Sequence, residues 1–287
     1  NVTLYAAWGH SLTFKANGGS GDMETLIMFE GDSAALPSNS FTRTGYNFVG
    51  WSASGTGIIA YTNTAACAMG SSNITLFARW NRSDATAESW FTYTYDDSAG
   101  TAEITEYPDS DSPASVVIPE FIGGNAWLVT SIENSAFTGC ADLTSVILPD
   151  SVTAIGIAAF SDCTSLASVT IPDSVTSIGS SAFAGCTALA SVTIPDSVTV
   201  IEATTFAICG SLTSITIPGS VTSIGNEAFL FCSSLETIIV KASVPPALGT
   251  NALYTSVSGF TIKVPAGTLS AYQGAWTDYA DYIVEQE

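Results

Sequence analysis

Apolar residues recur at a fixed spacing of 23 along residues 129–241. The clearest copy, residues 174–196, places a Val, an Ile, an Ala-Phe pair, a Cys, a Leu and a Val-Thr-Ile-Pro ending in that order. Four columns run through all five copies: Ile132, Ile155, Ile178, Ile201 and Ile224; Phe137, Phe160, Phe183, Phe206 and Phe229; Cys140, Cys163, Cys186, Cys209 and Cys232; Leu143, Leu166, Leu189, Leu212 and Leu235. Such a period predicts a solenoid, because one copy buries its apolar face only against its neighbours.

Each copy is expected to contain three elements. Residues 175–178 form a short strand, and residues 180–186 form about two turns of helix or 3₁₀ helix that bring apolar residues to one side. Residues 191–194 form a second strand with alternating inward and outward side chains, and Pro195 ends it because proline has no N–H for the ladder. The Gly that follows the Ile in three copies is replaced by Glu133 and Glu202 in the others, so no positive φ is expected there.

Two irregular segments flank the repeats. Residues 83–128 are expected to form an N-terminal cap with a hairpin over residues 90–107, because the first strand of a solenoid would otherwise expose unpaired backbone groups. Residues 242–287 are expected to contain a degenerate repeat and a final helix. In that helix Leu269, Tyr272 and Trp276 share one face and cover the last coil.

The Ile, Ala-Phe, Cys, Leu and Val-x-Ile-Pro columns resemble the BspA-like leucine-rich repeat of bacterial surface proteins. The resemblance covers residues 129–241, with degenerate copies outside this range. It implies a curved α/β leucine-rich-repeat solenoid, mostly β with short helical turns and a parallel sheet along one face.

A different pattern precedes residue 83. Strands are expected over residues 12–16, 25–29 and 46–51, with a turn at 17–21 where Asn and Gly tolerate positive φ. Residues 74–80 repeat the strand-like residues 2–8 with a similar sequence. Residues 1–10 are therefore expected to be the last strand of a preceding module, and the chain a segment of a longer protein.

Residues 11–80 resemble the Listeria–Bacteroides repeat, also called the InlB B-repeat. The features that match are Ala16-Asn-Gly-Gly19, Arg43-Thr-Gly-Tyr46, Phe48-Val-Gly-Trp51 and Asn73-Ile-Thr-Leu-Phe-Ala-Arg-Trp80. The resemblance implies a small β-grasp-like module over residues 11–82, of a kind found in bacterial surface and secreted proteins.

The charge pattern separates the two halves. Residues 1–82 carry four basic and four acidic residues, whereas residues 83–287 carry only Lys241 and Lys263 against 22 acidic residues. The net charge of −20 argues against nucleic-acid partners, whose phosphates require Lys and Arg. The chain also lacks a run of 18 apolar residues, so no membrane insertion is expected.

The candidate chemical groups are few. Stacked strands place the repeat cysteines ~4.8 Å apart with parallel side chains, which suits neither a disulfide nor a tetrahedral zinc site. A buried ladder of free thiols is expected instead, with all six cysteines titrating only after denaturation. His10 is the only histidine, so no Ser-His-Asp triad is expected. Asp96, Asp97, Asp109 and Asp111 lack calcium-loop spacing and are interpreted as solvated turn residues, with a calcium or sugar site as the alternative.

The outward positions of the second strands form the predicted strand face. It consists mostly of small hydroxyl residues: Ser145, Ile147, Ser168, Thr170, Ser191, Thr193, Ser214, Thr216, Thr237 and Ile239. Either this face is simply solvated, or it is a ligand floor, since solenoids present extended binding surfaces. Aromatic residues of the caps, such as Trp127, Tyr254 and Trp276, either anchor a partner or seal the ends.

The two resemblances imply an extracellular or cell-surface bacterial protein that mediates adhesion or protein–protein interaction. Partners of this kind are host extracellular-matrix proteins, surface glycoproteins or other microbes. The alternative is a structural spacer or envelope component without a specific ligand. No enzymatic activity, cofactor or metal is expected.

Overall fold

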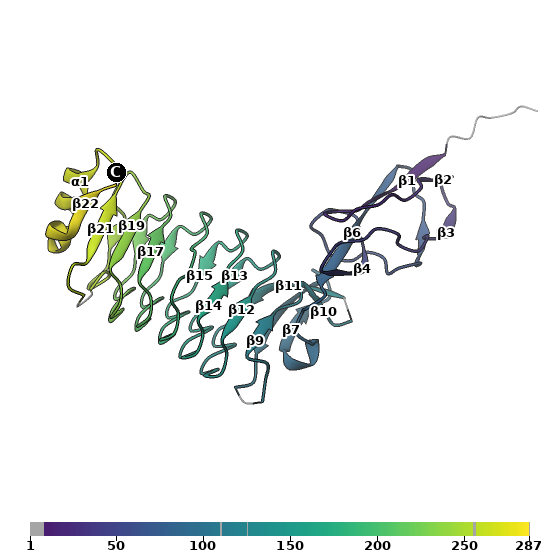
Figure 1. Cartoon of the computed structure of the whole chain (residues 1–287). Coiled ribbons are helices and arrows are strands. Elements are labelled where there is room, and N and C mark those ends of the chain that lie inside the picture. The colour runs from purple at the N-terminus through teal and green to yellow at the C-terminus, as the bar shows by residue number, and fades with distance from the viewer. Residues whose placement is uncertain (1–8, 110, 125, 255–256, 287) are drawn as a thin grey trace, which may run out of the picture. The chain divides into compact units, whose positions relative to one another are not determined.

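The computed structural model of the chain describes residues 9–109, 111–124, 126–254 and 257–286 (Figure 1). The chain forms two compact units, and residues 95–101 and 119–128 group with the N-terminal unit rather than with the repeats. Residues 83–128, expected to form one cap, are thus divided between the units. The strand expected at residues 2–8 lies outside the described residues.

The first unit is built on a four-stranded sheet in the order β2-β1-β6-β4. Strand β1 runs parallel to β6 and antiparallel to β2, and β4 pairs antiparallel with β6 through a bulge between Phe48 and Gly50. A separate pair, β3 and β5, was not expected from the sequence. The bounds are β1 (His10–Lys15), β2 (Leu26–Met28), β3 (Ser33–Ala35), β4 (Tyr46–Ser52), β5 (Ala66–Ala68) and β6 (Ile74–Arg82).

An aromatic cluster forms the core of this unit. Trp51 is fully buried, and the rings of Phe14, Phe41 and Phe48 surround it at centroid distances of 5.0, 6.1 and 4.9 Å. The turn at Asn17 has the predicted left-handed backbone, with φ of 48°. Burial of these rings supplies the apolar driving force that so small a module needs.

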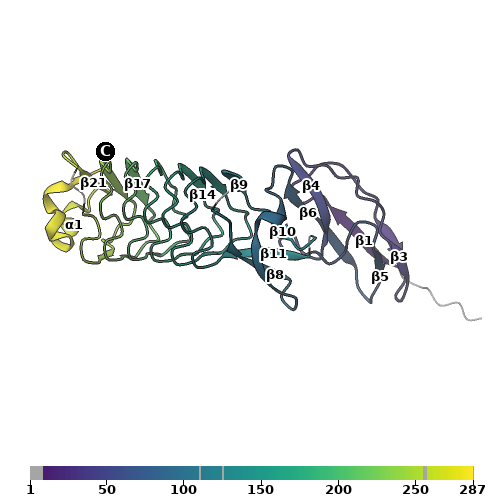
Figure 2. The ribbon, with the colours of Figure 1, turned by 90° about the horizontal axis from the view of Figure 1, so that it is seen from below.

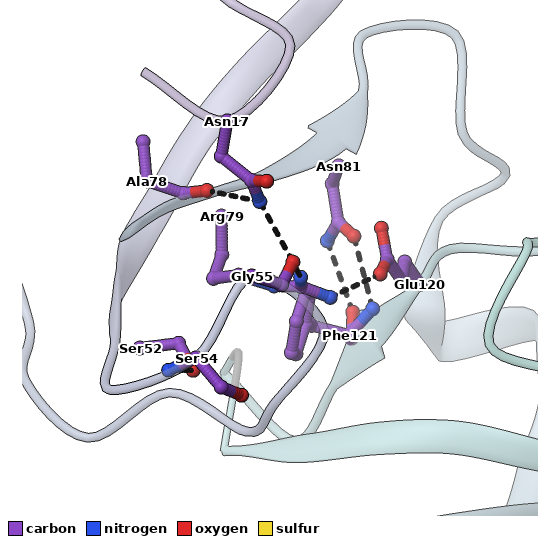
Figure 3. Close-up of polar contacts among 9 residues, drawn as sticks. All are labelled: Asn17, Ser52, Ser54, Gly55, Ala78, Arg79, Asn81, Glu120 and Phe121. Atoms are coloured by element: carbon purple, nitrogen blue, oxygen red, sulfur yellow. Dashed lines mark hydrogen bonds and ion pairs between the residues drawn. The ribbon is translucent and has the colours of Figure 1, made fainter. Parts of the chain in front are cut away.

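Arg79 of β6 is buried in the first unit and holds residues 119–121 against the sheet (Figure 3). Its guanidinium donates to the carbonyl of Gly55 and pairs with Glu120 Oε1 at 2.5 Å. It also lies 5.1 Å from the ring centroid of Phe121. Burial lowers the pKa of Arg79, and the Glu120 carboxylate opposes that shift. A buried cation needs such partners, because removing one leaves an uncompensated charge.

Two asparagine side chains complete this polar cluster. Asn81 Nδ2 donates to the carbonyl of Phe121 at 3.0 Å, and Asn81 Oδ1 accepts from the amide of Phe121 at 2.9 Å. Asn17 Nδ2 donates to the carbonyls of Gly55 and Ala78, both at 2.9 Å (Figure 3). The amide groups thereby satisfy backbone atoms that the sheet leaves unpaired.

The second unit contains the solenoid, whose coils stack beside one another (Figures 1 and 2). Most coils contribute a short strand to each of two sides, and the coil of residues 174–196 contributes one to the first side only. Preceding the coils are η1 (Glu88–Trp90), β7 (Thr92–Asp96), β8 (Thr101–Glu106), β9 (Ser115–Val117), β10 (Phe121–Ile122) and β11 (Trp127–Ile132), of which β10 belongs to the first unit. The coils then supply β12 (Ser145–Ile147), β13 (Ala154–Ile155), β14 (Ser168–Thr170), β15 (Ser177–Ile178), β16 (Val200–Ile201), β17 (Ser214–Ile217), β18 (Ser223–Ile224), β19 (Thr237–Val240), β20 (Ala247–Leu248) and β21 (Thr261–Val264).

Parallel ladders connect equivalent residues of successive coils. Ser145 pairs with Ser168, and Ser214 pairs with Thr237, each pair one repeat apart. The first strands form the orders β15-β13-β11-β8-β7 and β16-β18-β20. The second strands form the orders β14-β12-β9 and β17-β19-β21-β22. The solenoid expected from the sequence is therefore confirmed, and it is mostly β.

The repeated apolar columns form the core of the solenoid. The five repeat phenylalanines are fully buried and stack in one file, with ring centroids 4.9, 5.3, 5.6 and 5.6 Å apart. The Ile, Cys and Leu columns are buried beside them. Each ring thus contacts its copies in the neighbouring coils, which is the reason that the coils stabilise one another.

The helical segment expected at residues 180–186 is replaced by a series of turns. Ala182, Ala184 and Cys186 each donate to the carbonyl three residues earlier. Ser181 and Gly185, which lie among these residues, have left-handed φ values of 58° and 74°. The same conformation recurs at both positions in the other coils. A helix requires consecutive right-handed residues, so the two left-handed ones interrupt it.

The C-terminal end of the solenoid is closed as expected by a helix, α1 (Leu269–Ala275). Tyr272 and Trp276 are buried, with Tyr272 Oη donating to Ala242 and Trp276 Nε1 donating to Pro246 at 2.7 and 2.8 Å. After η2 (Thr277–Tyr282), strand β22 (Ile283–Glu285) pairs with β21, which the sequence did not predict. No helix in the described part of the chain is both long and apolar enough to cross a membrane.

Candidate functional site

The predicted strand face lies at the surface of the solenoid. Ser168, Thr170, Ser191, Thr193 and Ser214 are exposed. The other members, Ser145, Ile147, Thr216, Thr237 and Ile239, are partly exposed. Parallel pairing sets equivalent members side by side, and the hydroxyls of Ser145 and Ser115 lie 2.8 Å apart. The face can therefore offer rows of hydroxyl donors and acceptors to a ligand.

The middle of this face departs from the predicted pattern. Residues 191–194, expected to be a second strand, form no strand, and they separate β14 from β17. Val192 is partly exposed, as is Val169 in the preceding coil, whereas Ile215 and Ile238 in the next two coils are buried. A pocket of about 270 Å³ opens here, lined among others by Thr193, Thr216 and Lys241.

The same coil boundary interrupts the first-strand side, where β15 and β16 belong to different sheets. In the neighbouring coils a glycine occupies the position after the repeat Ile. A Cβ added at Gly156, Gly179 or Gly225 would lie within 2.5 or 2.6 Å of backbone atoms of the preceding coil. Glu202 holds this position at the interrupted boundary. We expect its Cβ to hinder the close approach that the glycines allow, so the glycine serves space rather than φ.

Lys241 lines this pocket and was not predicted as a site residue. It occupies a position at which Pro149, Pro172, Pro195 and Pro218 stand in the other coils. It is exposed and brings a cation to a solenoid that is otherwise strongly acidic. The replacement of the repeat proline by lysine is the sequence feature that could have identified this position.

The six cysteines are free and buried. Each repeat thiol donates to a backbone carbonyl of the preceding coil, as in Cys163 to Phe137 at 3.0 Å and Cys186 to Phe160 at 3.1 Å. Burial raises the pKa of Cys140 and Cys232 to about 11 and raises that of Cys163 further. The thiols are therefore held protonated, which makes them structural groups and poor nucleophiles.

The remaining candidates lie apart. His10 begins β1 in the first unit. Asp96 closes its own turn by accepting from Ser98 and Ala99, and the hydrogen bond from the Ser98 side chain lowers the pKa of Asp96. Asp109 accepts from the amide of Ala141 at 3.0 Å. Within the described ranges, no three His, Cys, Asp or Glu side chains gather as a metal site would require.

The three cap aromatics differ in their surroundings. Trp127 is partly buried and stacks on Tyr95 with centroids 4.0 Å apart. Trp276 is buried and seals the last coil, so it is not an exposed anchor. Tyr254 is exposed and lines a pocket beside α1. Of the three, Tyr254 alone is exposed.

Two protein families match the sequence. Residues 130–258 match the model of the BspA type leucine rich repeat region in six copies, and residues 10–79 match the Listeria-Bacteroides repeat domain. The repeat region, residues 130–258, is thus of the BspA leucine-rich-repeat type. A Listeria–Bacteroides repeat domain precedes its repeat region. Among curated proteins, none matches the sequence closely enough to count as a relative.

Solved structures of other leucine-rich repeat proteins resemble this one. The leucine rich repeat protein of T. pallidum is 27% identical with a TM-score of 0.52, over 71% of this chain and 98% of that one. A leucine rich cell surface protein of Faecalibacterium prausnitzii is 30% identical with a TM-score of 0.51, over 63% of this chain and 54% of that one. The chain thus spans about half the length of the latter protein.

Proposed function

We propose that this chain is a non-enzymatic protein of the bacterial cell surface that mediates adhesion through its leucine-rich-repeat solenoid. The observation that carries the proposal is the strand face, a surface of hydroxyl residues repeated from coil to coil on a buried and rigid core. The similarity to a protein described as a leucine rich cell surface protein supports the location.

The chemistry of the chain supports a binding role over a catalytic one. All six thiols are buried, and burial raises the pKa of the five repeat thiols. Binding through a sheet face needs no such group, because hydroxyl rows and the pocket at Thr193 and Lys241 supply hydrogen bonds and charge. Host extracellular-matrix proteins, surface glycoproteins and the surfaces of other microbes are the proposed partners.

The test measures binding of a panel of matrix proteins and glycans to the immobilised chain. A variant with Thr170→Lys, Thr193→Lys and Thr216→Lys is expected to lose saturable binding while it keeps its fold. The matched control carries Thr176→Lys, Thr199→Lys and Thr222→Lys, which adds the same charge to the other strand column. If neither variant changes the affinity, the strand face is not the site. If no panel member binds saturably, the chain is a spacer or envelope component instead.

A further inference from the structure

One position in each coil adopts a left-handed backbone whatever its residue. The φ values at this position are 76° at Gly139, 59° at Asp162, 74° at Gly185, 61° at Ile208 and 58° at Phe231. The amides of the first four donate to the next coil, as in Ile208 to Leu230 at 2.7 Å. The coil ladder therefore imposes the conformation, and the side chain does not choose it.

Large side chains fit this conformation poorly. Left-handed φ suits glycine because it has no Cβ, and a β-branched residue such as Ile208 is an outlier there. Gly139 and Gly185 demonstrate that the coil forms without a side chain at this position. The fold therefore does not require Ile208 or Phe231, and residues held in unfavourable backbone conformations cluster at functional sites.

These side chains are also exposed. Ile208 is 49% exposed and Phe231 is 59% exposed, and Tyr254 of the last coil is 48% exposed. The rings of Phe231 and Tyr254 meet edge to face with centroids 6.4 Å apart. We call Ile208, Phe231 and Tyr254 the apolar stripe. It lies on the turn segments of three successive coils, whereas the strand face lies on the second strands.

Two pockets flank the C-terminal end of the stripe. One of about 460 Å³ is lined by Tyr254, Asn251 and Asp278 among others, and one of about 200 Å³ is lined by Tyr254, Phe260 and Asp278 among others. Tyr254 thus stands at the rim of both. Such concave sites beside an exposed aromatic ring favour a partner that inserts its own side chains.

Charge determines which partner fits. Residues 83–287 carry 22 acidic residues and only two lysines, so a second copy of the chain would bring like charge to the stripe. Asp278, which lines both pockets, favours cations at the same surface. The aliphatic side chain of Ile208 offers nothing to sugar hydroxyls, which favours a polypeptide over a glycan.

We propose that the apolar stripe and the pockets beside Tyr254 dock a polypeptide segment that carries aliphatic or aromatic side chains interspersed with Lys or Arg. This inference rests on the proposed function only in treating the chain as a binding protein. The surface and the recognition chemistry are separate from those of the strand face.

A peptide selection tests the proposal directly. A phage-displayed library of random peptides is selected on the immobilised full chain, and enriched peptides are titrated by fluorescence anisotropy. They are expected to combine aromatic, Leu or Ile residues with Lys or Arg. Their affinity for a variant carrying Ile208→Gly, Phe231→Gly and Tyr254→Ser should fall about tenfold or more, as loss of central anchors does. The control Ile157→Ser removes a solenoid side chain that is 55% exposed but lies outside the stripe, and it should leave the affinity unchanged.

A second readout separates lost binding from lost folding. Because glycine accepts the left-handed backbone, Ile208→Gly and Phe231→Gly are expected to keep the thermal midpoint at or above that of the wild type. A lower midpoint would show that the fold needs these side chains and would overturn the inference. It is also overturned if no peptide is enriched, if enriched peptides bind the triple variant as well as the wild type, or if a glycan array reveals binding that depends on Tyr254 but not on Ile208. Matrix-protein binding that responds only to the strand-face lysine variants would leave the proposed function intact while this inference fails.

Discussion

At the scale of single residues, the phenylalanine file holds the solenoid together. Phe183 lies in its middle, fully buried between the rings of Phe160 and Phe206 at 5.3 and 5.6 Å. The replacement Phe183→Ala deletes a ring whose neighbours are fixed by their own coils, so the cavity cannot collapse fully. We expect a loss of about 3–5 kcal/mol in the free energy of unfolding, measured by urea denaturation. The control Ile157→Ala, at an exposed position, should change it by less than about 0.5 kcal/mol. A loss below about 1 kcal/mol at Phe183 would show that the file is not core.

The buried thiols make stability depend on alkaline pH. Burial raises the pKa of the repeat cysteines in the folded chain, to about 11 for Cys140 and Cys232. The pKa of a cysteine in the unfolded chain is about 8.5. Above about pH 8.5 the unfolded chain therefore releases protons that the folded chain retains. The free energy of unfolding is expected to fall as the pH rises from about 8.5 to 11.

A cysteine-depleted variant isolates this contribution. Chemical denaturation at pH 7.5, 9 and 10.5 is compared for the wild type and for Cys163→Ala, Cys186→Ala and Cys209→Ala combined. The variant removes three of the titrating groups, so its stability should decline less steeply over this range. Equal slopes for both proteins would assign the alkaline loss to other groups, such as the tyrosines.

At the scale of elements, we expect the interruption between β15 and β16 to be a local property of Glu202. The replacement Glu202→Gly removes the Cβ expected to hinder close approach, so the two strands are expected to pair as β13 and β15 do. The amides of residues 199 and 202 should then exchange more slowly with deuterium, and stability should rise by about 1 kcal/mol as new hydrogen bonds form.

Glu133 provides the matched control for this substitution. It holds the same position of the repeat, but its amide already donates to Ile104 at 2.8 Å. Glu133→Gly should therefore bring no gain in protection. Unchanged exchange at residues 199 and 202 in Glu202→Gly would mean that another residue keeps the coils apart.

The elements also indicate what the sequence could and could not predict. The 23-residue columns identified the core, because each coil repeats the same contacts and one period determines them all. The prediction of a helix at the turns was wrong. Ser181, Ile208 and Phe231 occupy left-handed positions, but residues of these types rarely adopt a positive φ, so the sequence did not indicate the break. The glycine before each turn was correctly expected to lack a positive φ. Its steric purpose emerged only from the neighbouring coil, which the local sequence does not contain.

The candidate site was predictable to a similar extent. The alternation of the second strands identified the exposed hydroxyl residues, but the sequence of residues 191–194 matches that of its neighbours and gave no sign of the opening at Thr193. The apolar stripe was not predicted, although Tyr254 was considered as an anchor. Ile208 and Phe231 are large apolar residues in a column that holds glycine in two other coils. This departure becomes visible only when the copies are aligned.

At the scale of the whole molecule, the chain combines a Listeria–Bacteroides repeat domain with a BspA-type solenoid. The solenoid carries nearly all of the negative charge and both candidate binding surfaces, whereas residues 1–82 are balanced in charge. Binding is therefore expected to reside in the repeats. Electrostatic attraction to a cationic partner should weaken as salt is added, since screening shortens the range of the field.

Hydrogen exchange of the intact chain, with and without a matrix protein from the panel that binds it, shows whether the repeats carry the binding surface. We expect binding to slow exchange within residues 130–258, at the strand face around Thr170 and Thr193 or at the turns that carry Phe231. Protection confined to residues 10–79, or no change anywhere in a chain that still binds, would contradict it.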